Sequence, residues 1–241
     1  MRINVHAGHN ADGRVACGAI GFIRESTEAR RVKDAVIAML RQLGHTVYDC
    51  TVDDAANVSD NLRKIVALCN AHKVDLDVSI HLNSGAKDAA GNGKTTGVEV
   101  YVYNSSGKAK ACAEKVCQAI AGLGFRNRGV KYSTGLYVLR NTKAPAMLVE
   151  CCFVDDKDDV QLYDCQAMAE AIVFGITGQR VQVQQPDVDQ EPVASEEETA
   201  VGDGRQLKRV QLGAYYVTSN AEAVLARAKA AGFDDAIIVN A

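Results

Sequence analysis

Two histidines and two carboxylates stand where the predicted strands and helices of this chain begin or end. His9 follows the first predicted strand, His81 ends the third, and Glu150 follows the last, while Glu25 opens the first predicted helix. In an open α/β sheet, side chains that follow the carboxyl ends of strands gather at one edge, where ligands bind. Two imidazoles and a carboxylate are typical ligands of a catalytic zinc ion, and a further carboxylate beside them is suited to general base catalysis.

Spacing alone leaves these assignments open. The four positions match no short metal-binding motif, and the chain of 241 residues contains five histidines, so a structural role for any one of them is a real alternative. His6 is a second candidate ligand three residues before His9, and Glu28 competes with Glu25 for the place on the helix.

The elements that must position these residues alternate between strand and helix along the first three quarters of the chain. Predicted strands cover residues 3–5, 45–50, 76–81, 98–103, 136–139 and 146–149, and predicted helices cover residues 25–43, 59–69, 108–123 and 156–176. A loop rich in Gly, Lys, Asp and Thr over residues 83–97 is expected to be mobile. This alternation predicts an α/β fold, with a mostly parallel, twisted sheet of about six strands and helices on both faces.

Composition divides the chain into three regions. Residues 1–178 carry the alternating pattern and are expected to form the main domain. Residues 179–205 contain two prolines and seven acidic residues without an apolar period, which predicts a solvated linker. Residues 206–241 predict a small βαβ unit, which is below the size that usually folds alone.

Charge and hydropathy exclude several classes of protein. The chain has 27 Lys and Arg against 30 Asp and Glu, a net charge of −3, so no global basic field for nucleic acid is expected. No apolar run is long enough to predict a membrane span, and the first strand is not followed by the glycine motif of a nucleotide-binding fold. The eight cysteines include no CxxC pair, and no signal peptide precedes the first strand. We therefore expect free, buried cysteines and synthesis in the cytoplasm.

Four short segments occur in a characteristic order: Gly8-His9-Asn10, Glu25 with the helix it opens, Ser79-Ile80-His81-Leu82-Asn83, and Leu148-Val149-Glu150. Together with Asn127-Arg128-Gly129-Val130, they resemble the zinc-dependent N-acetylmuramoyl-L-alanine amidases of the amidase-3 type. The resemblance covers about residues 1–178 and is strongest to the endolysins of phages that infect clostridia.

This resemblance implies one Zn²⁺ ion per catalytic domain, bound by His9, Glu25 and His81, with Glu150 as the catalytic carboxylate. It implies that peptidoglycan is the substrate, cut at the amide bond between N-acetylmuramic acid and the L-alanine of the stem peptide.

Glu150 also has a structural alternative, an ion pair with Arg128 or Arg140. At the level of the whole protein, a phage or prophage endolysin, released to the wall by a holin or by lysis, is the leading interpretation. The alternatives are a host autolysin of the same chemistry and a non-catalytic wall-binding protein with a structural zinc.

The C-terminal region carries a second resemblance. Arg209-Val210-Gln211-Leu212-Gly213, followed by Asn220-Ala221-Glu222-Ala223 and Ala231-Gly232-Phe233, is similar to a SPOR domain, a family that binds peptidoglycan. SPOR domains contain two βα repeats, whereas this chain has one, so a unit that serves only for oligomerisation is the alternative. Because a single βαβ unit leaves apolar surface uncovered, we expect a homodimer formed through residues 206–241.

Overall fold

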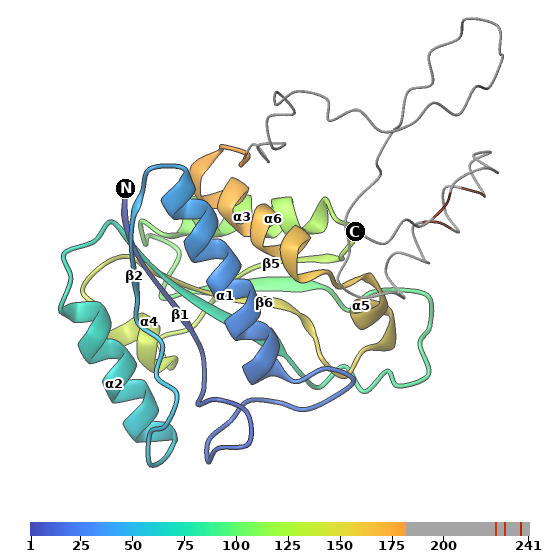
Figure 1. Cartoon of the computed structure of the whole chain (residues 1–241), viewed down its shortest axis with the longest axis horizontal. Helices are drawn as coiled ribbons and strands as arrows, with labels where there is room; N and C mark the ends of the chain where they lie inside the picture. Colours follow the sequence, from blue (N-terminus) through green and yellow to red (C-terminus); the bar gives the residue numbers. More distant parts are fainter. Residues whose placement is uncertain (182–224, 226–228, 230–236, 238–241) are drawn as a thin grey trace, which may run out of the picture. The chain divides into compact units, whose positions relative to one another are not determined.

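The computed structural model describes residues 1–181 together with residues 225, 229 and 237 (Figure 1). Residues Met1–Val181 form one compact unit. Except for residues 179–181, 225, 229 and 237, the predicted linker and the predicted C-terminal βαβ unit lie outside the described residues. Within the described part of the chain, no helix has both the length and the apolar character needed to cross a membrane.

A six-stranded sheet with the order β2-β1-β3-β6-β4-β5 forms the centre of this unit. Its strands are β1 (Arg2–Ala7), β2 (Thr46–Asp49), β3 (Leu76–Asn83), β4 (Val98–Val102), β5 (Asn127–Tyr132) and β6 (Ala146–Phe153). Neighbouring strands run parallel, except for the antiparallel pair of β4 and β6. The structure therefore confirms the predicted mostly parallel sheet.

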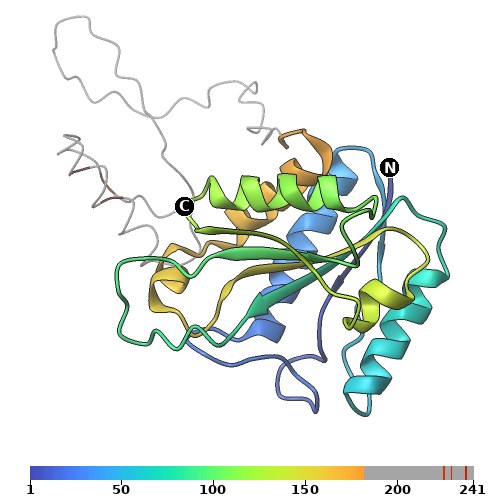
Figure 2. The same ribbon diagram turned by 180° about the vertical axis from the view of Figure 1, so that it is seen from behind.

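Helices cover both faces of the sheet (Figures 1 and 2). One face packs against α1 (Glu25–Gln42), α3 (Lys110–Ala121) and α6 (Cys165–Thr177), which contribute to the main core together with the strands. The other face carries α2 (Val58–Asn70) and the short α4 (Tyr137–Asn141), which share a smaller core around Ile65 and Val138. A short helix α5 (Lys157–Leu162) follows β6.

Side chains alternate across the two central strands β3 and β6. The apolar residues of β3 enter the main core, and so do alternate residues of β6: Leu76, Val78, Ile80, Leu82, Met147, Val149 and Cys151. Because successive strand residues point to opposite faces, His81 and Glu150 emerge on the other face, opposite each other in register. The period-two pattern of the sequence thus places two of the predicted functional residues side by side.

Two predicted elements, the strand over residues 136–139 and the helix over residues 156–176, differ in the structure, and one strand was not predicted. The segment 136–139, predicted as a strand, begins helix α4, whose last turn is closed by bonds from the Asn141 and Thr142 side chains to backbone carbonyls. The sixth strand is instead β5 (Asn127–Tyr132), which was not predicted because this edge strand carries mostly polar residues. The predicted helix over residues 156–176 is divided, because Asp164 caps the start of α6 by accepting a bond from Ala167 N.

The loop between β3 and β4, whose mobility stays a prediction, is irregular and is held by carboxylates that follow β6. Asp155 accepts hydrogen bonds from three consecutive backbone amides, those of residues 85, 86 and 87. Asp158 accepts from the amides of residues 92 and 93, and Asp156 accepts from Thr96. The loop is therefore attached along its length to the segment that follows β6.

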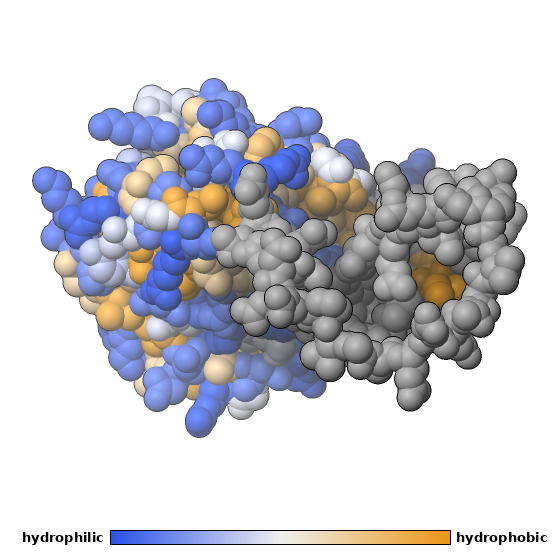
Figure 3. Space-filling view, turned by 45° about the horizontal axis from the view of Figure 1, so that its top comes forward, coloured by the Kyte–Doolittle hydropathy of each residue, from blue (hydrophilic) through white to orange (hydrophobic). Residues whose placement is uncertain are grey.

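The cysteines of the described unit are free, as the composition predicts, and most of them are buried. All eight cysteines are free, and five of them are buried: Cys50, Cys69, Cys117, Cys151 and Cys152. On the face drawn in Figure 3, hydrophilic side chains are interspersed with smaller hydrophobic areas. Among the exposed large hydrophobic residues, Val15, Ile20 and Phe22 lie on the segment between β1 and α1.

Candidate active site

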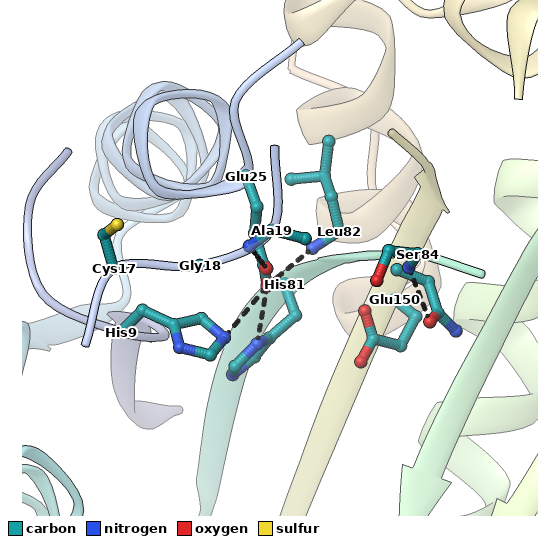
Figure 4. A pocket seen from close by; sticks show the side chains of 10 residues that line it. His9, Cys17, Gly18, Ala19, Glu25, His81, Leu82, Ser84 and Glu150 are labelled. Atoms are coloured by element: carbon teal, nitrogen blue, oxygen red, sulfur yellow. Dashed lines mark hydrogen bonds and ion pairs between the residues drawn. The ribbon is translucent and has the colours of Figure 1, made fainter. Parts of the chain in front are cut away.

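A pocket of about 290 Å³ lies at the carboxyl ends of β1, β3 and β6 (Figure 4). It is lined by His9, Cys17, Gly18, Ala19, Glu25, His81, Leu82, Asn83, Ser84 and Glu150. The structure therefore brings together in one pocket all four of the residues for which chemistry was predicted.

Three of these residues converge on one point. The Nε2 atom of His9 lies 3.3 Å from Oε1 of Glu25, and Nδ1 of His81 lies 2.9 Å from the same oxygen. The two imidazole rings meet edge to face, with 5.0 Å between their centroids. All three donor atoms lie within 4.8 Å of one another, and two nitrogens with one carboxylate oxygen form a set that suits zinc.

Glu25 is held in this position by the start of α1 and by the backbone around it. Its side chain is buried and accepts hydrogen bonds from the backbone amides of Ala19 (2.8 Å) and Leu82 (3.3 Å). Burial opposes the charged form, but the hydrogen bonds from His81 and His9 hold the pKa of Glu25 well below its usual range. Glu25 is therefore an ionised carboxylate between two imidazoles.

His9 is presented by a strained turn at the end of β1. Its backbone has φ of 62°, a left-handed conformation that few residues other than glycine adopt. The Asn10 side chain fixes the turn by donating to the carbonyls of Val15 (2.6 Å) and Ala55 (2.7 Å). Arg30 on α1 donates to the carbonyl of His9 itself at 3.0 Å. Strain of this kind persists only where several contacts enforce it, which is common at functional sites.

Two glycines allow the ligand side chains to approach the backbone. A Cβ atom on Gly8 would lie 2.0 Å from Cε1 of His81, and one on Gly18 would lie 2.5 Å from Oε2 of Glu25. Neither position has room for a side chain while His81 and Glu25 keep these places.

Glu150 lies on β6, and its carboxyl group has no ionic partner within the described part of the chain. Its Oε2 atom is buried and has no hydrogen-bond partner among the described residues. Burial, together with the negative charges of Glu25 and Glu99, raises the pKa of Glu150 to about 8. Neither predicted ion pair forms, because Arg128 bonds Glu99 and the Arg140 guanidinium lies over the Tyr137 ring.

The two alternative ligands lie outside the pocket lining. His6 is fully buried in the sheet, and burial together with the nearby His81 lowers its pKa to about 3. Glu28 is buried and accepts hydrogen bonds from Arg31 and from the Tyr163 hydroxyl. The geometry thus favours Glu25 and His9 over these alternatives.

Sequence reasoning missed several residues that support the site. Arg30 was not singled out from the sequence, although its guanidinium donates a hydrogen bond to the carbonyl of His9. Glu99 is buried next to the pocket and accepts a bond from Asn83, which lines it. The one signal for Glu99 in the sequence is its isolation as a charged residue in the apolar strand 98–102.

Comparison with known proteins finds relatives in clostridia and in a Bacillus phage. The chain is 35% identical over 164 residues to an uncharacterised protein of Clostridium perfringens, covering 68% of this chain and 47% of that protein. It is 32% identical over 165 residues to the endolysin of Bacillus phage SPP1, covering 65% of this chain and 56% of that protein. The chain spans about half the length of the first two curated relatives it matches.

Solved structures share the fold, and a family profile covers the same region. The catalytic domain of the CD27L endolysin, which targets Clostridium difficile, matches with a TM-score of 0.65 and 25% identity over 75% of this chain and 99% of that domain. Cwp6 from C. difficile matches with a TM-score of 0.61 and 30% identity over 73% of this chain and 28% of Cwp6. The profile of N-acetylmuramoyl-L-alanine amidase (Amidase_3) matches residues 3–178. With the His9, Glu25, His81 and Glu150 pocket inside that span, the chain belongs to the Amidase_3 family of N-acetylmuramoyl-L-alanine amidases.

Proposed function

We propose that this protein is a zinc-dependent amidase of peptidoglycan that hydrolyses the bond between N-acetylmuramic acid and the L-alanine of the stem peptide. His9, Glu25 and His81 are the residues that would hold one zinc ion, and Glu150 is the catalytic carboxylate. The observation that carries the proposal is the convergence of three donor atoms within 4.8 Å, in a pocket that also contains the Glu150 carboxylate, whose Oε2 has no partner among the described residues.

Zinc, when bound, supplies a Lewis acid that polarises the scissile carbonyl and makes a water molecule acidic near neutral pH. Two of the three ligands are held by named contacts, Glu25 by two backbone amides and His9 by its turn. Little reorganisation is therefore needed when the ion enters, which favours tight binding.

Glu150 has the protonation chemistry that amide hydrolysis requires. Its pKa is raised to about 8 because its carboxyl group is buried beside other negative charges. The pKa of Glu150 would fall, and its ionised form would be favoured, with a zinc ion held by His9, Glu25 and His81. Glu150 then accepts a proton from the attacking water and delivers it to the alanine nitrogen as the amide bond breaks, because an amine leaves poorly without protonation.

We further propose that the protein acts as a phage or prophage endolysin, which reaches the wall after release by a holin or by lysis. Two similarities support this role, those to the SPP1 endolysin and to the CD27L catalytic domain. A host autolysin of the same chemistry remains the second candidate, and the similarity to a sporulation-specific amidase of Bacillus subtilis, at 27% identity, favours that reading.

The C-terminal region would supply wall binding and dimerisation. Its resemblance to half a SPOR domain supports both roles, and residues 206–241 would pair with the same unit of a second chain. The linker 179–205 would let two catalytic domains act from one paired tail, which raises avidity for a polymeric substrate.

Zymography on gels that contain purified cell walls tests the amidase. The intact protein should clear the gel, a chelator should abolish clearing, and added zinc should restore it. Mass spectrometry of the digest should find stem peptides that begin with a free L-alanine amine. Clearing that persists after chelation would exclude a metal-dependent enzyme, and new reducing sugar ends would reassign the activity to the glycan. A chain that sediments with walls without cutting them would favour the non-catalytic alternative.

A further inference from the structure

A second group of polar side chains lies on the sheet beside Glu150. Glu99 on β4 is paired in register with Glu150 on β6, so the two side chains lie on the same face of the sheet. Glu99 is 4% exposed, which is unusual for a carboxylate unless it is paired. The proposed reaction gives this group no role.

The carboxylate of Glu99 accepts hydrogen bonds from two neutral donors and one positively charged donor. It accepts hydrogen bonds from Asn83 Nδ2 (2.8 Å), the Tyr101 hydroxyl (2.9 Å) and Arg128 Nε (2.8 Å). Burial opposes its charge, but the bonds from Arg128 and Tyr101 lower the pKa of Glu99 below its ordinary value. Because Asn83 also lines the pocket, the network adjoins the site of the proposed reaction.

Arg128 is held in place through its Nε atom, while its two terminal nitrogens have no acceptor among the residues that the structure describes. Its Nε atom bonds Glu99, and its guanidinium lies 5.1 Å from the centroid of the Phe153 ring. The Nη1 and Nη2 atoms form no hydrogen bond with the described residues, and 31% of the side chain is exposed. A guanidinium fixed in this way is preorganised to bind an anion from solvent.

Arg128 lies close enough to Glu150 for its side chain to contact a substrate group next to the scissile bond. It lies on β5, and β4 separates β5 from the strand of Glu150. Since neighbouring strands are spaced by about 4.8 Å, the backbones of Arg128 and Glu150 are roughly 10 Å apart. An extended peptide advances about 3.5 Å per residue, so a ligand cut beside Glu150 presents its next residue within reach of the Arg128 side chain.

We propose that Arg128 binds a carboxylate on the stem-peptide residue that follows the L-alanine, and so favours walls in which this carboxylate is free over walls in which it is amidated. This inference rests on the proposed function. A guanidinium presents two parallel N–H donors to a carboxylate, whereas a carboxamide offers one acceptor oxygen and no charge. Glu99 and Phe153 act as positioning residues for the guanidinium.

A pair of synthetic muramoyl dipeptides that differ only in a free carboxylate or a carboxamide at this position tests the proposal. The wild-type protein should have a kcat/KM roughly 10- to 100-fold higher for the carboxylate, and the difference should lie mainly in KM. Arg128→Gln should bring the ratio of the two kcat/KM values close to one. A wild-type ratio near one would overturn the proposal, and so would a variant that loses activity equally on both substrates.

Two further variants separate specificity from stability. Arg63→Gln removes an exposed guanidinium from α2 that bonds only Asp60 in the described part of the chain, and it should keep the wild-type ratio. Arg128→Lys keeps a positive charge beside Glu99 if the glutamine variant does not fold. Lysine offers a single ammonium group in place of the two parallel N–H donors of the guanidinium. This variant should therefore also lose most of the preference for the carboxylate substrate over the carboxamide. A lysine variant that keeps the full preference would contradict a bidentate site.

Binding of the free dipeptides, measured by calorimetry, distinguishes the subsite from the reaction. The carboxylate dipeptide should bind the wild-type protein more tightly than the carboxamide dipeptide, and Arg128→Gln should remove this difference. If the protein cleaves neither substrate but binds in this way, the amidase proposal fails and the subsite stands. If it cleaves both substrates equally and binds both dipeptides equally, the subsite fails and the amidase stands.

Discussion

Replacing Gly8 with alanine should disable the proposed metal site without removing any of its proposed ligands. An added Cβ atom would lie 2.0 Å from Cε1 and 2.1 Å from Nε2 of His81. Non-bonded carbon atoms rest about 3.5 Å apart, so the imidazole must move by roughly 1.5 Å. Metal–ligand distances tolerate deviations of only about 0.2 Å, so His81 would leave the coordination sphere.

The expected loss of zinc affinity is at least about 100-fold, because even changes to the partners of ligands cost about 10- to 100-fold. Gly8 is not among the glycines with positive φ, so the substitution adds no backbone strain. Crowding should lower the free energy of unfolding by about 1–3 kcal/mol. Zinc affinity is measured by competition with a chromophoric chelator, and stability is measured by urea unfolding of the metal-free protein.

Two controls make this test specific. Gly135→Ala adds a Cβ atom whose nearest neighbour is Ser133 Oγ at 3.8 Å, so both its zinc affinity and its stability should match the wild type. Combining Gly8→Ala with His81→Ala removes the ring that the methyl group meets, so the double variant should be more stable than additivity predicts. If Gly8→Ala binds zinc as tightly as the wild-type protein, the close approach of Gly8 to His81 does not govern the site.

Four other outcomes are expected. Glu150→Gln should keep zinc and the fold but lose roughly 10²- to 10⁴-fold of its activity, and stoichiometric zinc with near-normal lysis would remove Glu150 from the mechanism. Because burial lowers the pKa of His6 to about 3, the unfolded chain binds a proton between about pH 6.5 and pH 3 that the folded protein does not. Stability should therefore be full above pH 6.5 and fall below it by up to about 1.4 kcal/mol per pH unit, and urea unfolding of His6→Gln should show a shallower fall. Asp155→Ala removes the acceptor of three consecutive loop amides, so hydrogen exchange of residues 85–87 should accelerate, whereas unchanged exchange would show that other contacts hold the loop. Light scattering should find the full chain dimeric and the fragment 1–178 monomeric, and a monomeric full chain at tens of micromolar would exclude pairing through residues 206–241.

The sequence by itself was sufficient for the main architecture. Alternating apolar patterns predict five of the six strands and the long helices, because burial on one or both faces leaves a periodic record in the chain. It failed at the edge of the sheet, where β5 (Asn127–Tyr132) has little apolar surface to bury. It failed again at residues 136–139, where a short apolar run suits a strand and a helix equally and only the packing of α4 decides.

The sequence also named the residues of the pocket, because polar side chains at strand ends stand out against the apolar strands before them. Their roles stay predictions, but the tertiary structure decides among the alternatives that the sequence left open. It places Glu25 in the pocket and Glu28 against Tyr163, although both occupy the first turn of one helix.

Only the folded chain shows which charges meet. Arg128 was a candidate partner for Glu150, but register across β4 places Glu99 next to Glu150, and Glu99 takes the guanidinium. Among the described residues, Oε2 of Glu150 is consequently left without a hydrogen-bond partner, and burial beside Glu25 and Glu99 raises the pKa of Glu150 to about 8. The periodic spacing of apolar residues depends only on residues that are close in the sequence, so it can be recognised without the structure. The Glu99–Arg128 ion pair joins residues 29 positions apart, so it exists only once β4 and β5 have paired.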